Sequence, residues 1–237
     1  LCRGADWVLN LPLRLLQAIY KLLRRPFDDS FFATLAFEIG KEAFLAAGWF
    51  MALILCIPYQ YWNNGYSVLL FAFVLVLIFL GGMNDRAVRL SVRDFGPYLL
   101  FFFFAAVVSV PLSDYPDLSG RYLVYYFACF LVVLSLVNAV RNSAQLLRLA
   151  GGFALGLFVS SLYGLYQWLV IGVEVNPTFV DTNVNADMPG RVYSYFENPN
   201  AFGELLMLGL PIVVALISAS RRWYWKAAAC VVFCAGA

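Results

Sequence analysis

One arginine stands just before an apolar segment and could bind a phosphate group. Residues 191–200 read Arg-Val-Tyr-Ser-Tyr-Phe-Glu-Asn-Pro-Asn, and Arg191 is the only cation between positions 172 and 200. A guanidinium binds phosphate oxygens through two parallel hydrogen bonds and keeps its charge near lipid. Position alone leaves two interpretations equally open, because Arg191 could instead balance the charge of Asp187 or Glu197.

The next three residues predict how the following helix begins. Asn198 is a good N-cap, and Pro199 suits the first helical position. The helix would then present free backbone N–H groups and the positive end of its dipole, which together attract anions. Capping alone explains the motif about as well, so the role of Asn198 and Asn200 in binding an anion stays open.

Other polar residues near this point are candidates for a binding site. Glu204 lies one to two turns inside the helix, where an ionisable group is costly and suggests a function. It could transfer a proton, or it could pair with Arg191 or Arg121. Gln167, Tyr193 and Tyr195 could line a sugar site together with Tyr163, Trp168 and Phe196. Alternatively, Tyr163, Gln167 and Trp168 could form an aromatic belt at the membrane interface.

The composition indicates the class of protein to which these residues belong. The chain has 237 residues, of which 63% are hydrophobic and 13% charged, and its mean hydropathy is +0.79. Soluble globular chains are about 25% charged. We therefore expect an all-α integral membrane protein, built as a polytopic helical bundle.

Several reaction classes are poor matches to the residues. The chain has no histidine, and four of its five cysteines lie in apolar runs, so no metal site is expected. It has neither a phosphate-binding Walker loop nor a Gly-x-Ser-x-Gly elbow. We expect no cofactor, and no nucleic acid is needed to explain the basic segments.

Apolar runs predict the membrane spans, each of which needs about 20 residues. Six spans and the start of a seventh near position 227 follow from the sequence, at 43–59, 67–83, 96–112, 121–139, 149–171 and 201–219. The domain 41–237 is therefore predicted to be transmembrane. The chain lacks an initiating Met and ends inside an apolar run at Ala237, so we expect it to be an N-terminal fragment of a longer protein.

The basic residues predict the orientation in the cytoplasmic (inner) membrane. They gather in alternate connecting segments, whereas segments 60–66, 113–120 and 172–200 hold only Arg191, with Arg121 at the edge of a span. Basic loops stay in the cytoplasm. The N-terminus is therefore predicted to be inside and the long loop 172–200 outside, so that Arg121 and Arg191 are the cations available to an outer phosphate.

Residues 7–25 predict a helix of another kind. Its cations share one face with Gln17, and apolar side chains fill the remainder: Trp7, Leu11, Leu15, Ile19 and Leu22. We expect residues 1–40 to form a cytoplasmic segment whose amphipathic helix lies on the membrane surface. It could be a simple topological anchor, or it could bind a partner or anionic lipid.

Small residues recur at every fourth position of the fifth span. Gly152, Gly156, Ser160 and Gly164 form a ridge that would let another helix approach closely. We expect helix packing here, with a ligand groove as the alternative.

The segment 163–211 resembles the O-antigen ligase and polymerase family of bacterial membrane proteins. The similarity rests on Tyr-Gly-Leu-Tyr-Gln at 163–167, the long loop after it, and Arg191 followed by Phe196-Glu197-Asn198-Pro199-Asn200, Leu205 and Pro211. The resemblance implies metal-independent transfer of a glycan on the outer face of the cytoplasmic membrane. The donor would be linked to a polyprenyl diphosphate, and the acceptor would be a glycan, a lipid or a protein.

In this resemblance Arg191 would contact the diphosphate and stabilise the charge that leaves. Ligases of the family also use a histidine and further arginines in a later outer loop, which this chain lacks. No base that activates the acceptor follows from the sequence. A transporter or flippase of lipid-linked sugars and a non-catalytic envelope scaffold are the alternatives.

Overall fold

The computed structural model describes residues 2–27, 43–61, 91–92, 96–173 and 190–237, together with the single positions 65, 69, 72, 73 and 76. Every regular element among these residues is helical, and they contain no strand. The chain divides into two compact units. The first comprises Leu1–Phe44 and Gly65–Ser143, and the second comprises Leu45–Asn64 and Ala144–Ala237.

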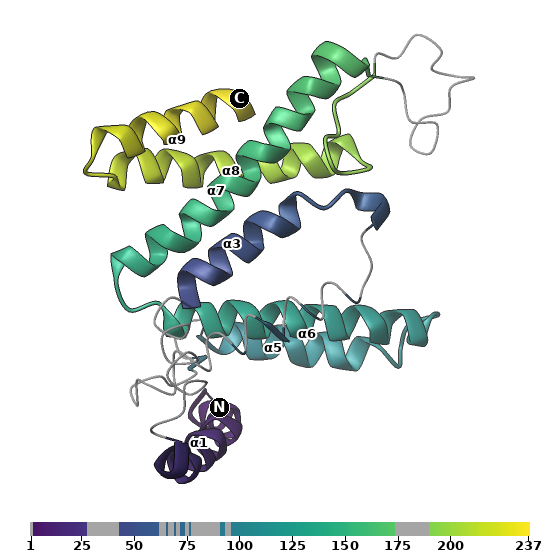
Figure 1. The fold of residues 1–237 in the computed structure, drawn as a ribbon. Coiled ribbons are helices and arrows are strands. Elements are labelled where there is room, and N and C mark those ends of the chain that lie inside the picture. Colours follow the sequence, from purple (N-terminus) through teal and green to yellow (C-terminus); the bar gives the residue numbers. More distant parts are fainter. Residues whose placement is uncertain are drawn as a thin grey trace. The chain divides into compact units, whose positions relative to one another are not determined.

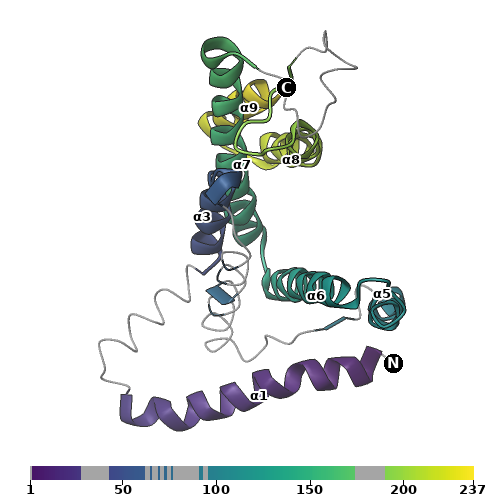
Figure 2. The same cartoon turned by 90° about the vertical axis from the view of Figure 1, so that its right-hand side faces the viewer.

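The first unit holds α1 (Cys2–Phe27), α5 (Gly96–Ser109) and α6 (Pro116–Ala139). Proline near the start of α6 and Asp117 in its first turn suit the positive end of that helix. Helices α5 and α6 lie side by side (Figures 1 and 2). Aromatic rings join them, with the centroids of Phe103 and Phe130 4.7 Å apart.

The predicted amphipathic helix is present as α1, which begins five residues earlier and ends two residues later than expected. The apolar side chains of Trp7, Leu11 and Ile19 are exposed. A polar contact holds its first turns, because the Asp6 carboxylate accepts the Val92 N–H at 2.8 Å and the Ser91 hydroxyl at 3.1 Å. Figure 2 shows α1 as one long helix.

The second unit carries the candidate site. It comprises most of α3 (Ala43–Leu55), the 3₁₀ turn η1 (Tyr59–Tyr61), α7 (Ser143–Tyr166), a π-helical turn η3 (Gln167–Ile171), α8 (Pro199–Ala219) and α9 (Trp223–Gly236). Helices α8 and α9 lie side by side. The core of this unit joins α7, α8 and α9 through Ala154, Leu157, Val213 and Ala229.

Three residues of the ridge on α7, Gly152, Gly156 and Ser160, contact α3, whereas Gly164 contacts Val192 and Phe202. Figure 1 shows α7 beside α3. A Cβ added to Gly156 would lie 2.9 Å from the Ala52 Cα, and the Ser160 hydroxyl donates to the Leu55 carbonyl at 2.8 Å. Gly152 meets the backbone of Gly48. The expectation of close helix packing is confirmed.

The described helices overlap the predicted spans, with shifted ends, but α3 has only 13 residues and α5 only 14, fewer than a membrane span needs. Helix α3 ends at Leu55 rather than at 59, because Pro58 disfavours a helical residue before it. Helix α7 begins at Ser143, six residues before the predicted span. The span expected at 67–83 lies almost wholly outside the described residues.

Two of the described helices are long and apolar enough to cross a membrane: Ser143–Ile171, with 29 residues, and Pro199–Ala219, with 21. In the first helix, only 33% of the most apolar segment is buried in the protein. In the second helix, this share is 17%. Core helices of soluble proteins are mostly buried, so this exposed apolar surface is typical of a helix that contacts lipid.

Candidate functional site

The cap predicted at the start of α8 is present. The Asn198 side chain accepts the Asn200 N–H at 2.8 Å, and Pro199 occupies the first turn. The Asn198 carbonyl accepts the Phe202 N–H at 3.2 Å, which is the first regular bond of the helix. Pro199 has no N–H, and the Asn200 N–H is bonded to the cap. Fewer backbone N–H groups are therefore free at this helix start than the sequence predicts. An anion at this helix start would depend on side chains.

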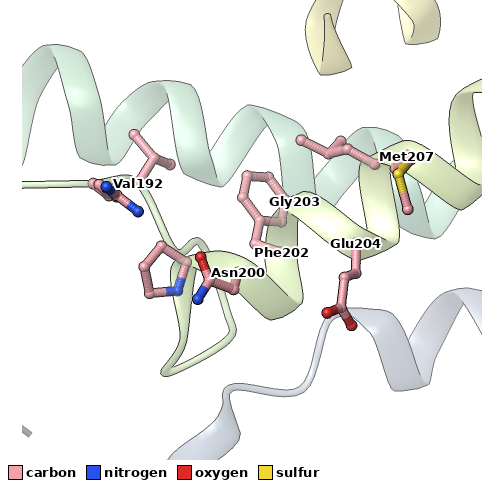
Figure 3. Close-up of a pocket in the computed structure, with 9 residues that line it drawn as sticks. Val192, Asn200, Phe202, Gly203, Glu204 and Met207 are labelled. Atoms are coloured by element: carbon pink, nitrogen blue, oxygen red, sulfur yellow. The ribbon is translucent and has the colours of Figure 1, made fainter. Parts of the chain in front are cut away.

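An open groove with a volume of about 630 Å³ lies beside this helix start (Figure 3). Its polar side chains are those of Arg191, Asn200 and Glu204, all of them exposed. The remainder of its wall is largely apolar and consists of Val192, Pro199, Phe202, Gly203, Leu206 and Met207. The groove therefore pairs one cation and one carboxylate with an apolar surface.

Helical spacing explains which residues of α8 share the groove. Gly203 and Glu204 follow Asn200 by three and four positions, and Met207 follows them by four and three, so the four residues fall on one face. Figure 3 shows Asn200 near the start of the helix and Met207 about two turns further along. The sequence prediction named Asn200 and Glu204 but missed Gly203 and Met207, which the same periodicity could have found.

The charged groups of the groove do not neutralise each other. Within the part of the chain that the structure describes, Arg191 forms no ion pair with either Glu197 or Glu204. The expected alternative of an Arg191–Glu204 pair is therefore wrong for this structure. Asp187 lies outside the described residues.

Glu197 has another partner. Its carboxylate interacts with the Tyr59 hydroxyl, and this hydrogen bond, followed by repulsion from the carboxylate charge, raises the pKa of Tyr59 above its ordinary value. The neighbouring backbone is joined as well, because the Tyr59 N–H donates to the Tyr195 carbonyl at 2.8 Å. The turn after α3 is thus attached to the loop that carries Arg191.

Three residues predicted to line a sugar site, Gln167, Tyr193 and Tyr195, do not line this groove. The ring of Tyr195 stacks on that of Tyr163 at 4.4 Å, and burial is the main cause that raises the pKa of Tyr195. The side-chain carbonyl of Gln167 accepts the N–H groups of Tyr193 and Ser194. Contact of Gln167, Tyr193 or Tyr195 with a substrate stays a prediction.

The remaining predicted residue, Arg121, is an exposed residue of α6 and belongs to the first unit. Its contact with a phosphate also stays a prediction. No group of three or more His, Cys, Asp or Glu side chains with metal-binding geometry occurs among the described residues.

No family model matches this chain, and neither a curated protein nor a solved structure is significantly similar to it.

Proposed function

We propose that this chain forms the site for the donor diphosphate in a membrane glycosyltransferase. The enzyme would transfer a glycan from a polyprenyl-diphosphate donor to a glycan, lipid or protein acceptor. The observation that carries the proposal is an exposed arginine in an open groove, without an ion pair to the described carboxylates beside it. A cation without an ion pair to the described carboxylates, next to a capped helix start, is suited to an anionic ligand.

The shape and polarity of the groove favour a donor that is linked to a lipid. Arg191 and Asn200 lie at the start of α8 and Glu204 one turn further along, while Phe202, Leu206 and Met207 supply an apolar wall. Seven positions of helix separate Asn200 from Met207, which corresponds to about 10 Å along the axis. A diphosphate beside Arg191 could therefore extend an isoprenoid chain along α8, which a soluble nucleotide sugar would not use.

The reaction would be a single displacement at the anomeric carbon. The acceptor hydroxyl oxygen forms the new glycosidic bond, and the bond from the anomeric carbon to the phosphate oxygen breaks. The polyprenyl diphosphate leaves with the electron pair, and Arg191 stabilises its charge. Loss of one such stabilising group costs about 10²–10³ in rate.

The hydroxyl proton needs an acceptor, and the groove offers one carboxylate. Glu204 lines the groove, whereas Glu197 interacts with Tyr59. We therefore assign Glu204 rather than Glu197 as the candidate base. A general base of this kind contributes about 10²–10⁴ in rate when it reaches the proton that it removes.

The proposed setting is the cytoplasmic membrane, with a polytopic helical bundle and the groove on the outer face. The two long apolar helices and the exposed apolar side chains of α1 support membrane association. The orientation rests on the distribution of Lys and Arg between alternate loops. Helix α1 would lie on the inner surface with its N-terminus in the cytoplasm.

The test compares the wild-type protein with Arg191→Ala in its own cells, at matched abundance in the membrane. Polyprenyl-diphosphate glycans are measured by mass spectrometry, and their leaflet is tested by access to an added glycosidase. We expect the glycans to accumulate on the outer leaflet, because transfer is blocked after the donor has crossed the membrane. Arg221→Ala, at the opposite end of α8, is the matched control and should not cause accumulation.

Two other results would contradict the proposal. Accumulation only on the inner leaflet would indicate a flippase. Unchanged glycan levels in Arg191→Ala would mean that the arginine plays no part in transfer.

A further inference from the structure

The loop that carries Arg191 is attached to the end of α7 by one buried amide. Gln167 is the first residue of the π-helical turn η3, and only 4% of it is exposed. Its side-chain oxygen accepts the Tyr193 N–H at 3.1 Å and the Ser194 N–H at 3.0 Å. One side chain therefore holds two successive amides, which lie two and three positions after Arg191. Such π-helical turns often occur at functional sites.

Ser194 shows how tightly this part of the loop is held. Its φ of 53° lies in the left-handed region, which a non-glycine residue occupies at some energetic cost. The residue is 3% exposed, and its hydroxyl donates to the Ser160 carbonyl of α7. Contacts on both sides of the residue thus keep it in this conformation.

Packing fixes the segment between these hydrogen bonds and the groove. Gly164 of α7 faces Val192, and a Cβ added there would lie 3.1 Å from the Val192 Cγ1 and 3.2 Å from the Phe202 ring. Val192 and Phe202 both line the groove, and Val192 follows Arg191 directly. The backbone beside Arg191 is therefore positioned by α7 through residues that do not themselves carry charge.

We propose that Gln167 is a positioning residue for Arg191. By holding the amides of Tyr193 and Ser194, its side-chain oxygen fixes the loop so that the guanidinium is presented to the groove. A site that is held in place before binding loses less conformational freedom when its ligand arrives. The inference rests on the proposed function, in which Arg191 binds a lipid diphosphate. Gln167 would act on that ligand only through Arg191.

The test measures binding of undecaprenyl diphosphate to the whole protein in nanodiscs of phosphatidylcholine and phosphatidylglycerol. Gln167→Met keeps the size of the side chain but removes the acceptor, and it should weaken binding about five- to tenfold. Gln167→Glu keeps an acceptor oxygen at the position of the Gln167 Oε1 and should bind within about threefold of wild type. Gln60→Met, the same substitution at an exposed position of η1, is the matched control.

A double variant separates positioning from general damage to the fold. Arg191→Ala should weaken binding by at least about tenfold, since hydrogen bonds to charged groups are lost. Adding Gln167→Met to Arg191→Ala should cause less than about a twofold further change, because residues that act through one another are not additive. If Gln167→Met does not fold, Gln167→Asn replaces it, because its side chain is one methylene shorter and withdraws the acceptor oxygen from the Tyr193 and Ser194 amides.

The outcomes distinguish the two proposals. If Arg191→Ala binds weakly but Gln167→Met or its replacement binds like wild type, the positioning role is wrong and the diphosphate site stands. An additive double variant, or a Gln167→Glu protein as weak as Gln167→Met, would also overturn the positioning role. If Arg191→Ala itself binds like wild type, the proposed function fails.

Discussion

Gly152 of α7 lies directly against the backbone of Gly48 of α3, with no room for a side chain on either residue. A Cβ added to Gly152 would overlap the Gly48 backbone, and one added to Gly48 would lie 2.8 Å from the Arg148 carbonyl oxygen. This contact begins the packing that continues through Gly156 and Ser160 toward the candidate site.

Substitution of Gly152 should separate the two helices. We expect Gly152→Ala to destabilise the protein by about 1–3 kcal/mol, because overpacking forces backbone shifts. Gly151→Ala is the matched control, since a Cβ there would meet nothing within 4 Å. It should be neutral or should stabilise α7 by up to about 1 kcal/mol through its higher helix propensity. Thermal unfolding in detergent compares the two variants, and equal stability would refute the close contact.

Lysine should not replace Arg191. A lysine ammonium is a point charge and cannot form the planar pair of hydrogen bonds that a guanidinium offers to phosphate oxygens. We expect Arg191→Lys to lose glycan transfer almost as completely as Arg191→Ala, by about 10²–10³. The measurement is the rate at which the lipid-linked donor is consumed in membranes of matched protein content. Full activity of the lysine variant would exclude bidentate binding.

Two substitutions of Asn198 should distinguish the effect of the helix cap on stability from the effect of charge on ligand binding. We expect Asn198→Ala to cost about 1 kcal/mol of stability, because the Asn200 N–H loses its acceptor. Asn198→Asp keeps the cap and should retain stability, but its negative charge at the helix start should weaken binding of undecaprenyl diphosphate. Unfolding and binding are measured on both variants. Equal loss of stability in the two would mean that the cap contributes nothing.

The Tyr59–Glu197 interaction should appear in an alkaline titration. Because the folded protein raises the pKa of Tyr59 above its ordinary value of 10.0, the interaction stabilises the fold fully below that value. The stabilisation should be lost as the pH rises through the higher folded pKa. The difference in tyrosinate absorbance between wild type and Tyr59→Phe reports this single group. Glu197→Gln should move the titration of Tyr59 back toward lower pH, and an unchanged titration would exclude the interaction.

Much of the local structure could be predicted because it depends on neighbouring residues. The Asn198 cap joins atoms two residues apart, and Pro199 begins the helix through its own fixed φ. The ridge of Gly152, Gly156 and Ser160 could be predicted as a helix contact, since small residues at helical spacing permit close approach. The sequence contains no sign that α3, rather than another helix, occupies it.

The composition of the groove was harder to predict. Arg191, Asn200 and Glu204 could be named from their types, but their relationship depends on how the loop enters α8. An Arg191–Glu204 ion pair, one of the alternatives that the sequence leaves open, does not form, although the two residues are close in sequence and line the same groove. Charge in a sequence shows which pairs are possible, whereas the backbone path decides which ones form.

The sequence by itself therefore determined the helical class, the positions of the long apolar helices and the cap of α8, because hydropathy and capping act over a few neighbouring residues. Only the tertiary structure decided that Gln167 holds the loop from 26 positions away and that Ser160 reaches Leu55 across 105 positions. These contacts arise because buried polar groups must find partners wherever close packing brings segments together. As a result, Gln167 and Ser160 hold the loop through hydrogen bonds, while the Arg191 side chain is exposed in the groove.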